Sequence, residues 1–243
     1  MKHKNNFFDL SRVAFLFSLE LTKIKKYALI TLGATVGIMF LISIMIVGLT
    51  PNINFASFYY VGLYISGILL AGTAFSDFRK KETAIMYLTL PASVFEKLLS
   101  QIFIVSFGFV IFYSLAFLLY WGTVYMWRSF LQLETPLPFY IFESNQFIHS
   151  LLYLWFWQSA FLVGSATFNK APLIKTMAVV FVVSAFLAVY VMFLFTKMVF
   201  DNMQWGPHMM FHSDVSLFDS DWLLLLIPVF WVVTYLKIKE KQV

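Results

Sequence analysis

Six long apolar runs, separated by short polar segments, dominate the pattern of hydrophobic and polar positions along the chain. A helix of about 20 apolar residues crosses the hydrocarbon core of a bilayer, so each run predicts a membrane-spanning helix. The predicted spans are about 27–49, 55–75, 98–126, 148–168, 176–196 and 222–238. No remaining stretch suits a soluble domain, so we expect residues 1–243 to form a single transmembrane domain of the all-α class.

Two of the runs depart from the length of a simple span. The third is longer than a bilayer requires, so its helix is expected to project, tilt or break near Gly122. The sixth is short and contains Pro228. Lys237 lies at its end and Lys239 just after it, and both can complete the span by reaching to the interface.

The segment before the first span, residues 9–26, predicts a separate helix that lies in the membrane interface. Asp9 or Ser11 can cap its N-terminus. Apolar residues fall at helical spacing on one face, and basic residues mark another: Ala14, Phe17, Leu21 and Ile24, against Arg12, Lys23 and Lys26. A helix with this partial division of apolar and basic residues is typical of the surface of a membrane.

Composition supports the membrane assignment, and the distribution of basic residues predicts the orientation. Charged residues make up 12% of the chain, whereas soluble domains carry about a quarter. Of the 17 lysines and arginines, only Arg128 and Lys197 fall on the side opposite the N-terminus when six spans are drawn. Since basic loops stay in the cytoplasm, we expect a multi-pass protein of the cell (inner) membrane with both termini cytoplasmic. The same rule explains the net charge of +5 without a nucleic-acid partner.

The largest predicted cytoplasmic loop, residues 76–97, contains more ordered structure than a simple connection needs. Residues 78–88 predict a short helix, which a Thr-Leu-Pro sequence ending at Pro91 stops, because proline disfavours helix in the residue before it. Ser93 and Glu96 have the spacing of a capping box, which begins the next helix. One interpretation of the short helix is a membrane-surface segment whose basic residues contact anionic lipid.

A different interpretation comes from a resemblance to the membrane subunits of ABC transporters, most closely the type-2 exporter class of permeases. The shared architecture is an interfacial helix, six spans with both ends inside, and a helical loop after the second span. The shared sequence is confined to that loop. There, Leu-Pro-Ala-Ser at 90–93 and Glu-Lys at 96–97 resemble the residues that precede the third helix in that family.

The resemblance implies a role for each part of the loop. Residues 78–88 would form a coupling helix that docks on a cytoplasmic ABC ATPase subunit. The residues expected to contact the ATPase are Arg79, Lys80, Glu82, Ile85, Met86 and Tyr87. Tyr87 is expected to be an aromatic anchor in that contact. The residues expected to hold the loop rigidly to the spans are Pro91, Ser93 and Glu96. The resemblance further implies two permease copies, as a homodimer or with a related permease.

The chain itself lacks the features of an ATPase. It contains no G-x-x-x-x-G-K-[ST] phosphate loop, so ATP would be bound by the partner subunit, and we expect no cofactor in this chain. Few ionisable residues lie at membrane depth, although ion-coupled carriers usually need some there. This favours energy supplied from outside the bilayer. The alternative function is a non-transporting membrane scaffold or assembly factor.

Patterns of small and polar residues inside the spans have two interpretations each. Gly33-x-x-x-Gly37 and Gly67-x-x-x-Ala71 permit close contact between helices, either within the chain or between two chains. Gln158 lies in the middle of a span, where it can line a pathway or donate a packing hydrogen bond. In both cases we favour packing within the chain.

No pattern indicates catalysis or a metal site. The chain contains no cysteine, which excludes disulfides and thiolate ligands. Neither H-E-x-x-H nor G-x-S-x-G occurs, so we expect no catalytic residues. His208 and His212 bracket two methionines in the outer loop 197–221, and such residues can hold copper. No second cluster accompanies them, so we expect no metal. The loop is amphipathic and either dips into the membrane or remains outside.

Overall fold

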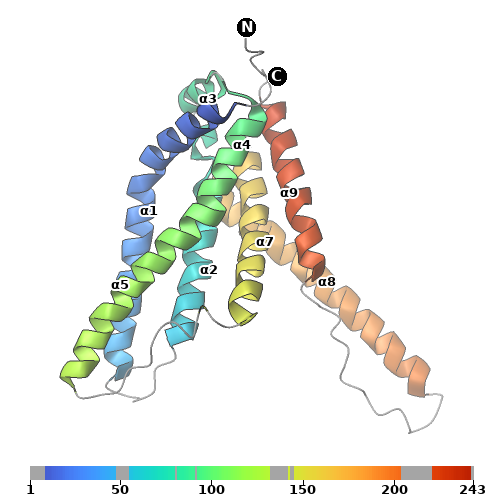
Figure 1. The fold of residues 1–243 in the computed structure, drawn as a ribbon. Coiled ribbons are helices and arrows are strands. Elements are labelled where there is room, and N and C mark those ends of the chain that lie inside the picture. The colour runs from blue at the N-terminus through green and yellow to red at the C-terminus, as the bar shows by residue number, and fades with distance from the viewer. Residues whose placement is uncertain are drawn as a thin grey trace.

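The computed structural model describes residues 9–47, 55–79, 81–90, 92–131, 142, 145–203 and 221–241, and these residues contain no strand. Figure 1 shows their arrangement. The elements are α1 (Leu10–Val47), α2 (Phe55–Thr73), the 3-10 turn η1 (Ser76–Arg79), α3 (Lys81–Leu88), α4 (Val94–Ile102), the π-helical segment η2 (Phe103–Gly108), α5 (Phe109–Phe130), α7 (Asn145–Thr167), α8 (Pro172–Met203) and α9 (Asp221–Glu240). The expected all-α class is therefore confirmed.

Four helical stretches in the described part of the chain are long and apolar enough to cross a membrane. They are Ala56–Thr73, Val94–Phe130, Gln146–Thr167 and Pro172–Leu194. A helix pairs its own backbone polar groups, which is what lipid demands of a spanning segment. The chain is therefore an α-helical membrane protein. A shorter apolar stretch, Leu29–Ser43, lies within α1, and α9 contains Pro228.

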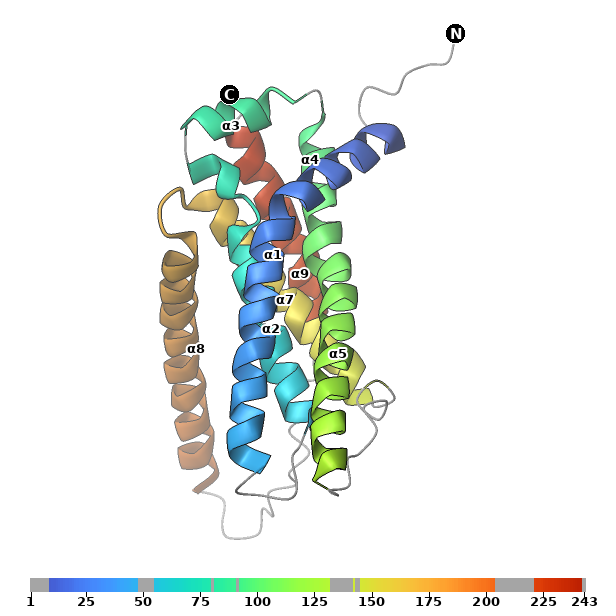
Figure 2. The same ribbon diagram turned by 90° about the vertical axis from the view of Figure 1, so that its left-hand side faces the viewer.

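The predicted interfacial helix and the predicted first span are one continuous helix. α1 runs for 38 residues, without a break near residues 26 and 27 where we expected two elements to meet. Neither proline nor glycine lies close to this point, so nothing in the local sequence stops the helix. Figure 2 shows the first part of α1 leaning away from the axis of the remainder. The change of direction is therefore made by bending a single helix.

The irregularity expected in the third span exists, but it does not lie near Gly122. That glycine lies inside α5, because one glycine weakens a helix without necessarily ending it. The irregular part is η2, where the backbone is π-helical. Within η2 the Val105 carbonyl accepts a hydrogen bond of 3.0 Å from the side-chain Nε2 of Gln158 on α7. Gln158 is buried, so its expected role as a packing residue is confirmed.

α2 and α7 lie side by side in the middle of the bundle (Figures 1 and 2). Gly67 permits their close approach. A Cβ atom there would lie 2.9 Å from the Leu154 side chain and 3.0 Å from that of Gln158. Aromatic rings continue the core, and the ring centroids of Tyr59 and Phe117 are 4.9 Å apart. Gly67 is thus used for packing within the chain, as expected.

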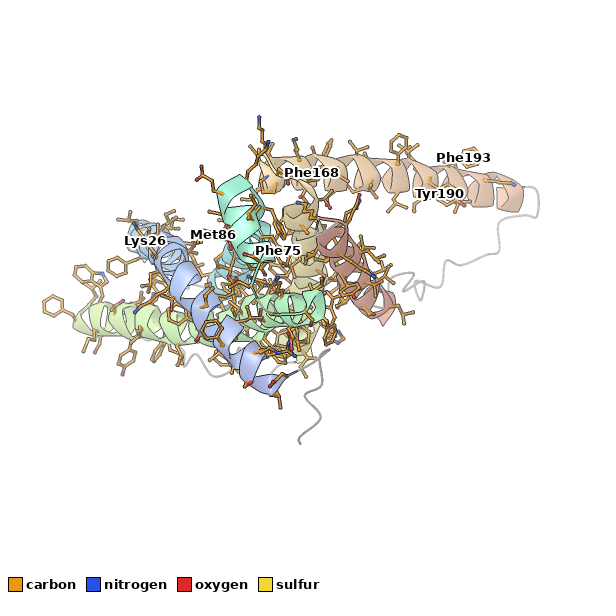
Figure 3. All side chains as sticks on the ribbon, turned by 90° about the horizontal axis from the view of Figure 1, so that it is seen from above. Lys26, Phe75, Met86, Phe168, Tyr190 and Phe193 are labelled. Carbon is orange, nitrogen blue, oxygen red and sulfur yellow. The ribbon has the colours of Figure 1, made fainter. Side chains whose placement is uncertain are left out.

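α8 stands apart from the other helices (Figure 1), and Figure 3 shows Tyr190 and Phe193 far out along it. Within Pro172–Leu194 the share of the most apolar window buried inside the molecule is 0%. Only the first turns touch the bundle, where Thr176 is buried. Proteins rarely expose an apolar surface of this size to water. We therefore expect lipid or another membrane protein to cover α8.

One end of the described bundle gathers basic residues from several helices. The start of α1, α3, the start of α4 and the end of α9 lie together at this end (Figure 1). Arg12, Lys25, Lys81, Lys97, Lys237, Lys239 and Lys241 belong to these elements. Arg128 lies near the far end of α5, and Lys197 lies near the end of α8. We call the first group of elements the basic end.

Candidate functional site

The loop between α2 and α4 lies at the basic end, and its described part begins with a stacked pair of aromatic rings. Phe75 follows α2 and Phe78 lies in η1, and their ring centroids are 5.7 Å apart with the planes nearly parallel. Thr83 on α3 donates its hydroxyl to the backbone carbonyl of Asp77 at 2.7 Å. These contacts fix the direction in which α3 leaves the turn.

Tyr87 attaches α3 to the bundle, and this corrects our expectation that it is presented to a partner. Its side chain is only 3% exposed. The ring meets Phe78 edge to face at 5.5 Å between centroids, and the Nζ atom of Lys97 lies 5.5 Å from the ring centroid. A cation over an aromatic face is attracted by the ring quadrupole. Tyr87 is therefore an internal anchor and not a contact surface.

Ser93 and Glu96 form the capping box expected from the sequence, at the start of α4. The Glu96 amide donates to Ser93 Oγ at 3.2 Å, and the Ser93 amide donates to Glu96 Oε2 at 2.8 Å. Each residue thus satisfies a backbone donor that the helix leaves unpaired. The turn before α4 is consequently held in one geometry.

Glu96 also joins α4 to α1, a role that the local sequence did not indicate. Its carboxylate is fully buried, and its Oε1 atom accepts the backbone amide of Asp9 at 2.8 Å. The Arg12 guanidinium lies 3.3 Å from the same oxygen. Asp9 in turn accepts the Ser11 amide at 2.9 Å, so it caps α1. One buried carboxylate therefore fixes the beginnings of two helices.

The surroundings of Tyr87 keep its phenol neutral. Burial raises the pKa of Tyr87 well above its ordinary value, and the negative charges of Glu20 and Asp77 add to this, while an interaction with Gln101 opposes it. Glu20 and Gln101 are themselves buried, on α1 and α4. The joint between α1, α3 and α4 is thus polar inside. Three buried polar side chains from three helices therefore meet at this joint.

The outer face of α3 carries a small apolar patch. Ile85 is 62% exposed and Met86 is 70% exposed, and Figure 3 shows Met86 on this end of the molecule. Glu82 and Thr89 are also exposed and lie on the same side of the helix, since residues three and four apart are neighbours. We call these four residues the α3 patch. The patch thus combines an exposed apolar pair with two exposed polar side chains.

The remaining expected contacts have mixed outcomes. Arg79 ends η1, and its side chain lies outside the described part of the structure. Lys80 and Pro91 lie outside the described residues altogether. Of the six expected docking residues, the structure exposes Glu82, Ile85 and Met86 and buries Tyr87. These three exposed residues are the ones that remain as candidates for docking.

Sequence reasoning missed the contribution of the chain's last helix. The Nζ atom of Lys241 lies 4.5 Å from the ring centroid of Phe78 and donates to Asn169 Oδ1 at 2.9 Å. Lys241 thereby connects the end of α9 to η1 and to the turn between α7 and α8. Residues more than 70 positions apart meet here, and no local pattern predicts such a contact.

No protein-family model, curated protein or solved structure matches this chain. The described residues hold no group of three or more His, Asp or Glu side chains able to bind a metal ion. His208 and His212 lie outside the described residues, as does most of the outer loop that contains them. The geometry of the α3 patch and its anchors is therefore the feature of the described residues that bears on function.

Proposed function

We propose that the chain is the membrane-spanning permease subunit of an ATP-driven exporter of the ABC type-2 class. The observation that carries the proposal is a short helix outside the predicted spans that is anchored by Tyr87 and exposes Ile85 and Met86. A membrane-surface helix would turn its apolar residues toward the bundle or the lipid and its charges toward water. Here Tyr87 faces inward and anchors the helix, whereas Ile85 and Met86 face outward and are exposed, so they can contact a cytoplasmic ATPase.

Coupling would follow from the way α3 is joined to the spans. Closure of the ATPase subunits on ATP would displace α3. Phe78 and Tyr87 connect that helix to the end of α2, and Lys97 connects it to α4. Glu96 then extends the same rigid unit to α1. A push on the α3 patch would therefore move three spanning helices together.

A permease of this class works as a pair, and α8 supports that part of the proposal. Beyond its first turns, the apolar length of α8 is exposed in the described structure. A second copy of this chain, or a related permease, would cover part of α8 and enclose a pathway with it. The surfaces available are apolar, which suits lipids, hydrophobic peptides or drugs as the exported class.

The six-span topology predicts a specific pattern of labelling. The natural chain has no cysteine, so single cysteines report without background. Cysteines at Ser76 and Asn169, which are exposed near the basic end, are expected to react only with membrane-permeant thiol reagents in intact cells. A cysteine at Ser129, exposed at the end of α5, is expected to react with impermeant reagents. Labelling of Ser76 by an impermeant reagent would contradict the cytoplasmic placement of α3.

Purification in mild detergent tests the proposed function directly. The permease proposal expects a protein with a phosphate loop to accompany the chain, and ATP hydrolysis in that complex but none by the isolated chain. A complex that contains other membrane proteins but no ATPase would instead favour the scaffold alternative. Hydrolysis by the isolated chain would contradict both assignments.

A further inference from the structure

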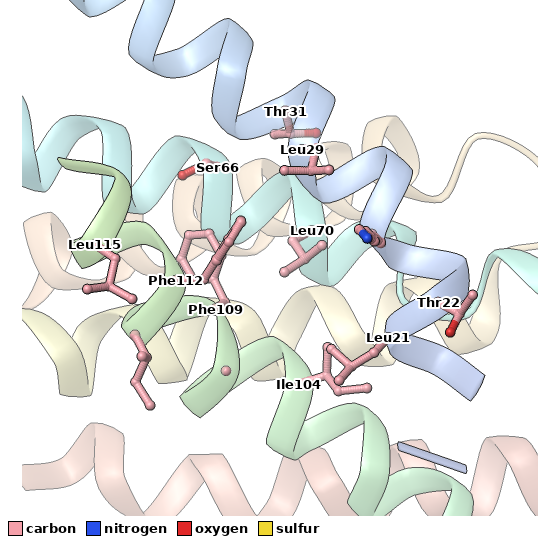
Figure 4. A pocket seen from close by; sticks show the side chains of 13 residues that line it. Leu21, Thr22, Leu29, Thr31, Ser66, Leu70, Ile104, Phe109, Phe112 and Leu115 are labelled. Carbon is pink, nitrogen blue, oxygen red and sulfur yellow. The ribbon is translucent and has the colours of Figure 1, made fainter. Parts of the chain in front are cut away.

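A groove runs along the bundle between α1 and the continuous η2–α5 helix (Figure 4). Its first part, near the basic end, has a volume of about 560 Å³ and is bordered by Leu21, Leu70 and Phe109 among others. A second hollow of about 650 Å³ continues it along the same two helices. Leu29 and Leu115 line both parts. The groove therefore extends through much of the depth that a membrane would occupy.

The lining of the groove changes along its length. Lys25 is the one charged residue among the described residues that border it, and it lies at the end nearer the basic end. The hydroxyls of Thr22, Ser66 and Thr123 donate to carbonyls of their own helices. They therefore require no polar partner from the groove. An occupant meets a cation at one end and an apolar surface beyond it.

Gly33 and Gly37 widen the second part of the groove. A Cβ atom added at either position would have no heavy atom within 4 Å. This outcome differs from our expectation that the Gly33-x-x-x-Gly37 pattern serves packing inside the chain. Gly67, by contrast, is closed over by α7. The space beside the two glycines is left open by the fold.

The dimensions and charge of the groove match a lipid chain with an anionic head. The stretch of α1 from Lys25 to Phe40 is about 22 Å long at 1.5 Å per residue. One leaflet contributes about half of a hydrocarbon core that is about 30 Å thick, so a single acyl chain of that leaflet fits within the groove. Lysines near the end of a span reach toward the headgroups. Lys25 therefore lies where it can pair with the phosphate of a lipid head group.

We infer that this groove binds an anionic glycerophospholipid from the leaflet at the basic end. One acyl chain lies along Gly33 and Gly37, and the lipid phosphate pairs with Lys25. The same acyl chain also covers Ile104 and Gly108 of η2, where the protein backbone is π-helical. The inference needs only the membrane location of the chain. Loss of the proposed ATPase partner would leave lipid binding intact.

Photo-crosslinking with phosphatidylglycerol that carries a diazirine in its acyl chain tests the inference on the full chain in nanodiscs. Crosslinks are expected in peptides of α1 and α5 that border the groove. A Gly33→Leu, Gly37→Leu double variant is expected to lower this labelling at least tenfold, because the added side chains would occupy space that is open around both Cβ positions. Gly122→Leu is the matched control, since a Cβ there also meets nothing within 4 Å and Gly122 does not border the groove.

Native mass spectrometry tests the head group with equal amounts of phosphatidylglycerol and phosphatidylcholine. Both lipids carry a phosphate, but only phosphatidylglycerol is anionic, because the choline cation offsets the phosphate charge of phosphatidylcholine. Lys25→Gln is expected to lower retained phosphatidylglycerol about fivefold relative to phosphatidylcholine. This is the effect expected when one lysine near a membrane surface no longer attracts an anionic lipid. Lys26→Gln alters an exposed neighbour that does not border the groove, and it is expected to change this ratio less than twofold.

Two results would overturn the inference. One is unchanged crosslinking in the double leucine variant, and the other is an equal loss in Gly122→Leu. Unchanged crosslinking can be accompanied by a change of oligomeric state in the double leucine variant. That result would assign the open glycines to a second copy of the chain instead of a lipid.

Discussion

A double variant, Ile85→Asp with Met86→Asp, is expected to insert normally into the membrane but to lose the ATPase partner and all transport. Both side chains are exposed, and other residues anchor the helix, so the fold does not depend on them. A truncated hot spot costs about 2 kcal/mol or more, which is at least about 30-fold in affinity. Placing two carboxylates in the contact adds the cost of burying unpaired charge.

Co-purification with the ATPase measures this loss, and thermal unfolding of the isolated chain in detergent shows that the fold is kept. Lys81→Ala is the matched control. Its side chain is exposed on the same helix, and a single surface charge contributes about 0–1 kcal/mol. Wild-type association in the double aspartate variant would make α3 a membrane-surface helix and remove the main support for the permease proposal.

Tyr87→Ala is expected to act on stability and not on the contact surface. Removing a buried aromatic ring leaves a cavity and costs about 3–5 kcal/mol. The lost ring also leaves Phe78 without its edge-to-face contact and Lys97 without its aromatic partner. A lower melting temperature in detergent is expected, and ATPase association is lost only to the extent that the fold is lost. A stable Tyr87→Ala protein that fails to bind would show that Tyr87 belongs to the docking surface.

Tyr87→Phe separates the ring from the hydroxyl and makes the pH dependence measurable. It keeps the aromatic contacts, so a loss of about 1 kcal/mol is expected for the hydroxyl. Burial raises the pKa of Tyr87 in the folded protein. The unfolded chain releases the phenol proton near its ordinary pKa of about 10. Between about pH 10 and the raised folded pKa, the wild type loses stability relative to the phenylalanine variant as pH rises. Below about pH 10 the difference in stability between the two proteins is constant.

Much of the architecture follows from the sequence because its causes are local. An apolar run of about 20 residues can satisfy its backbone in lipid only as a helix, so α2 and α7 begin and end within about three residues of the expected spans. α8 contains its expected span but extends beyond it at both ends. Ser93 and Glu96 are three residues apart and need nothing else to form their capping box. Even the exposed position of Glu82, Ile85 and Met86 follows from one helical face.

The tertiary structure alone decided the features that depend on distant residues. Tyr87 is an anchor because Phe78 and Lys97 close around it, and its own segment does not reveal which side faces inward. The π-helical backbone of η2 lies against Gln158, 53 positions from Val105. Gly67 is covered while Gly33 is open, although both occur in similar patterns. Two small residues four positions apart allow a helix to pack closely. Whether it does so depends on whether the tertiary structure places another helix against them.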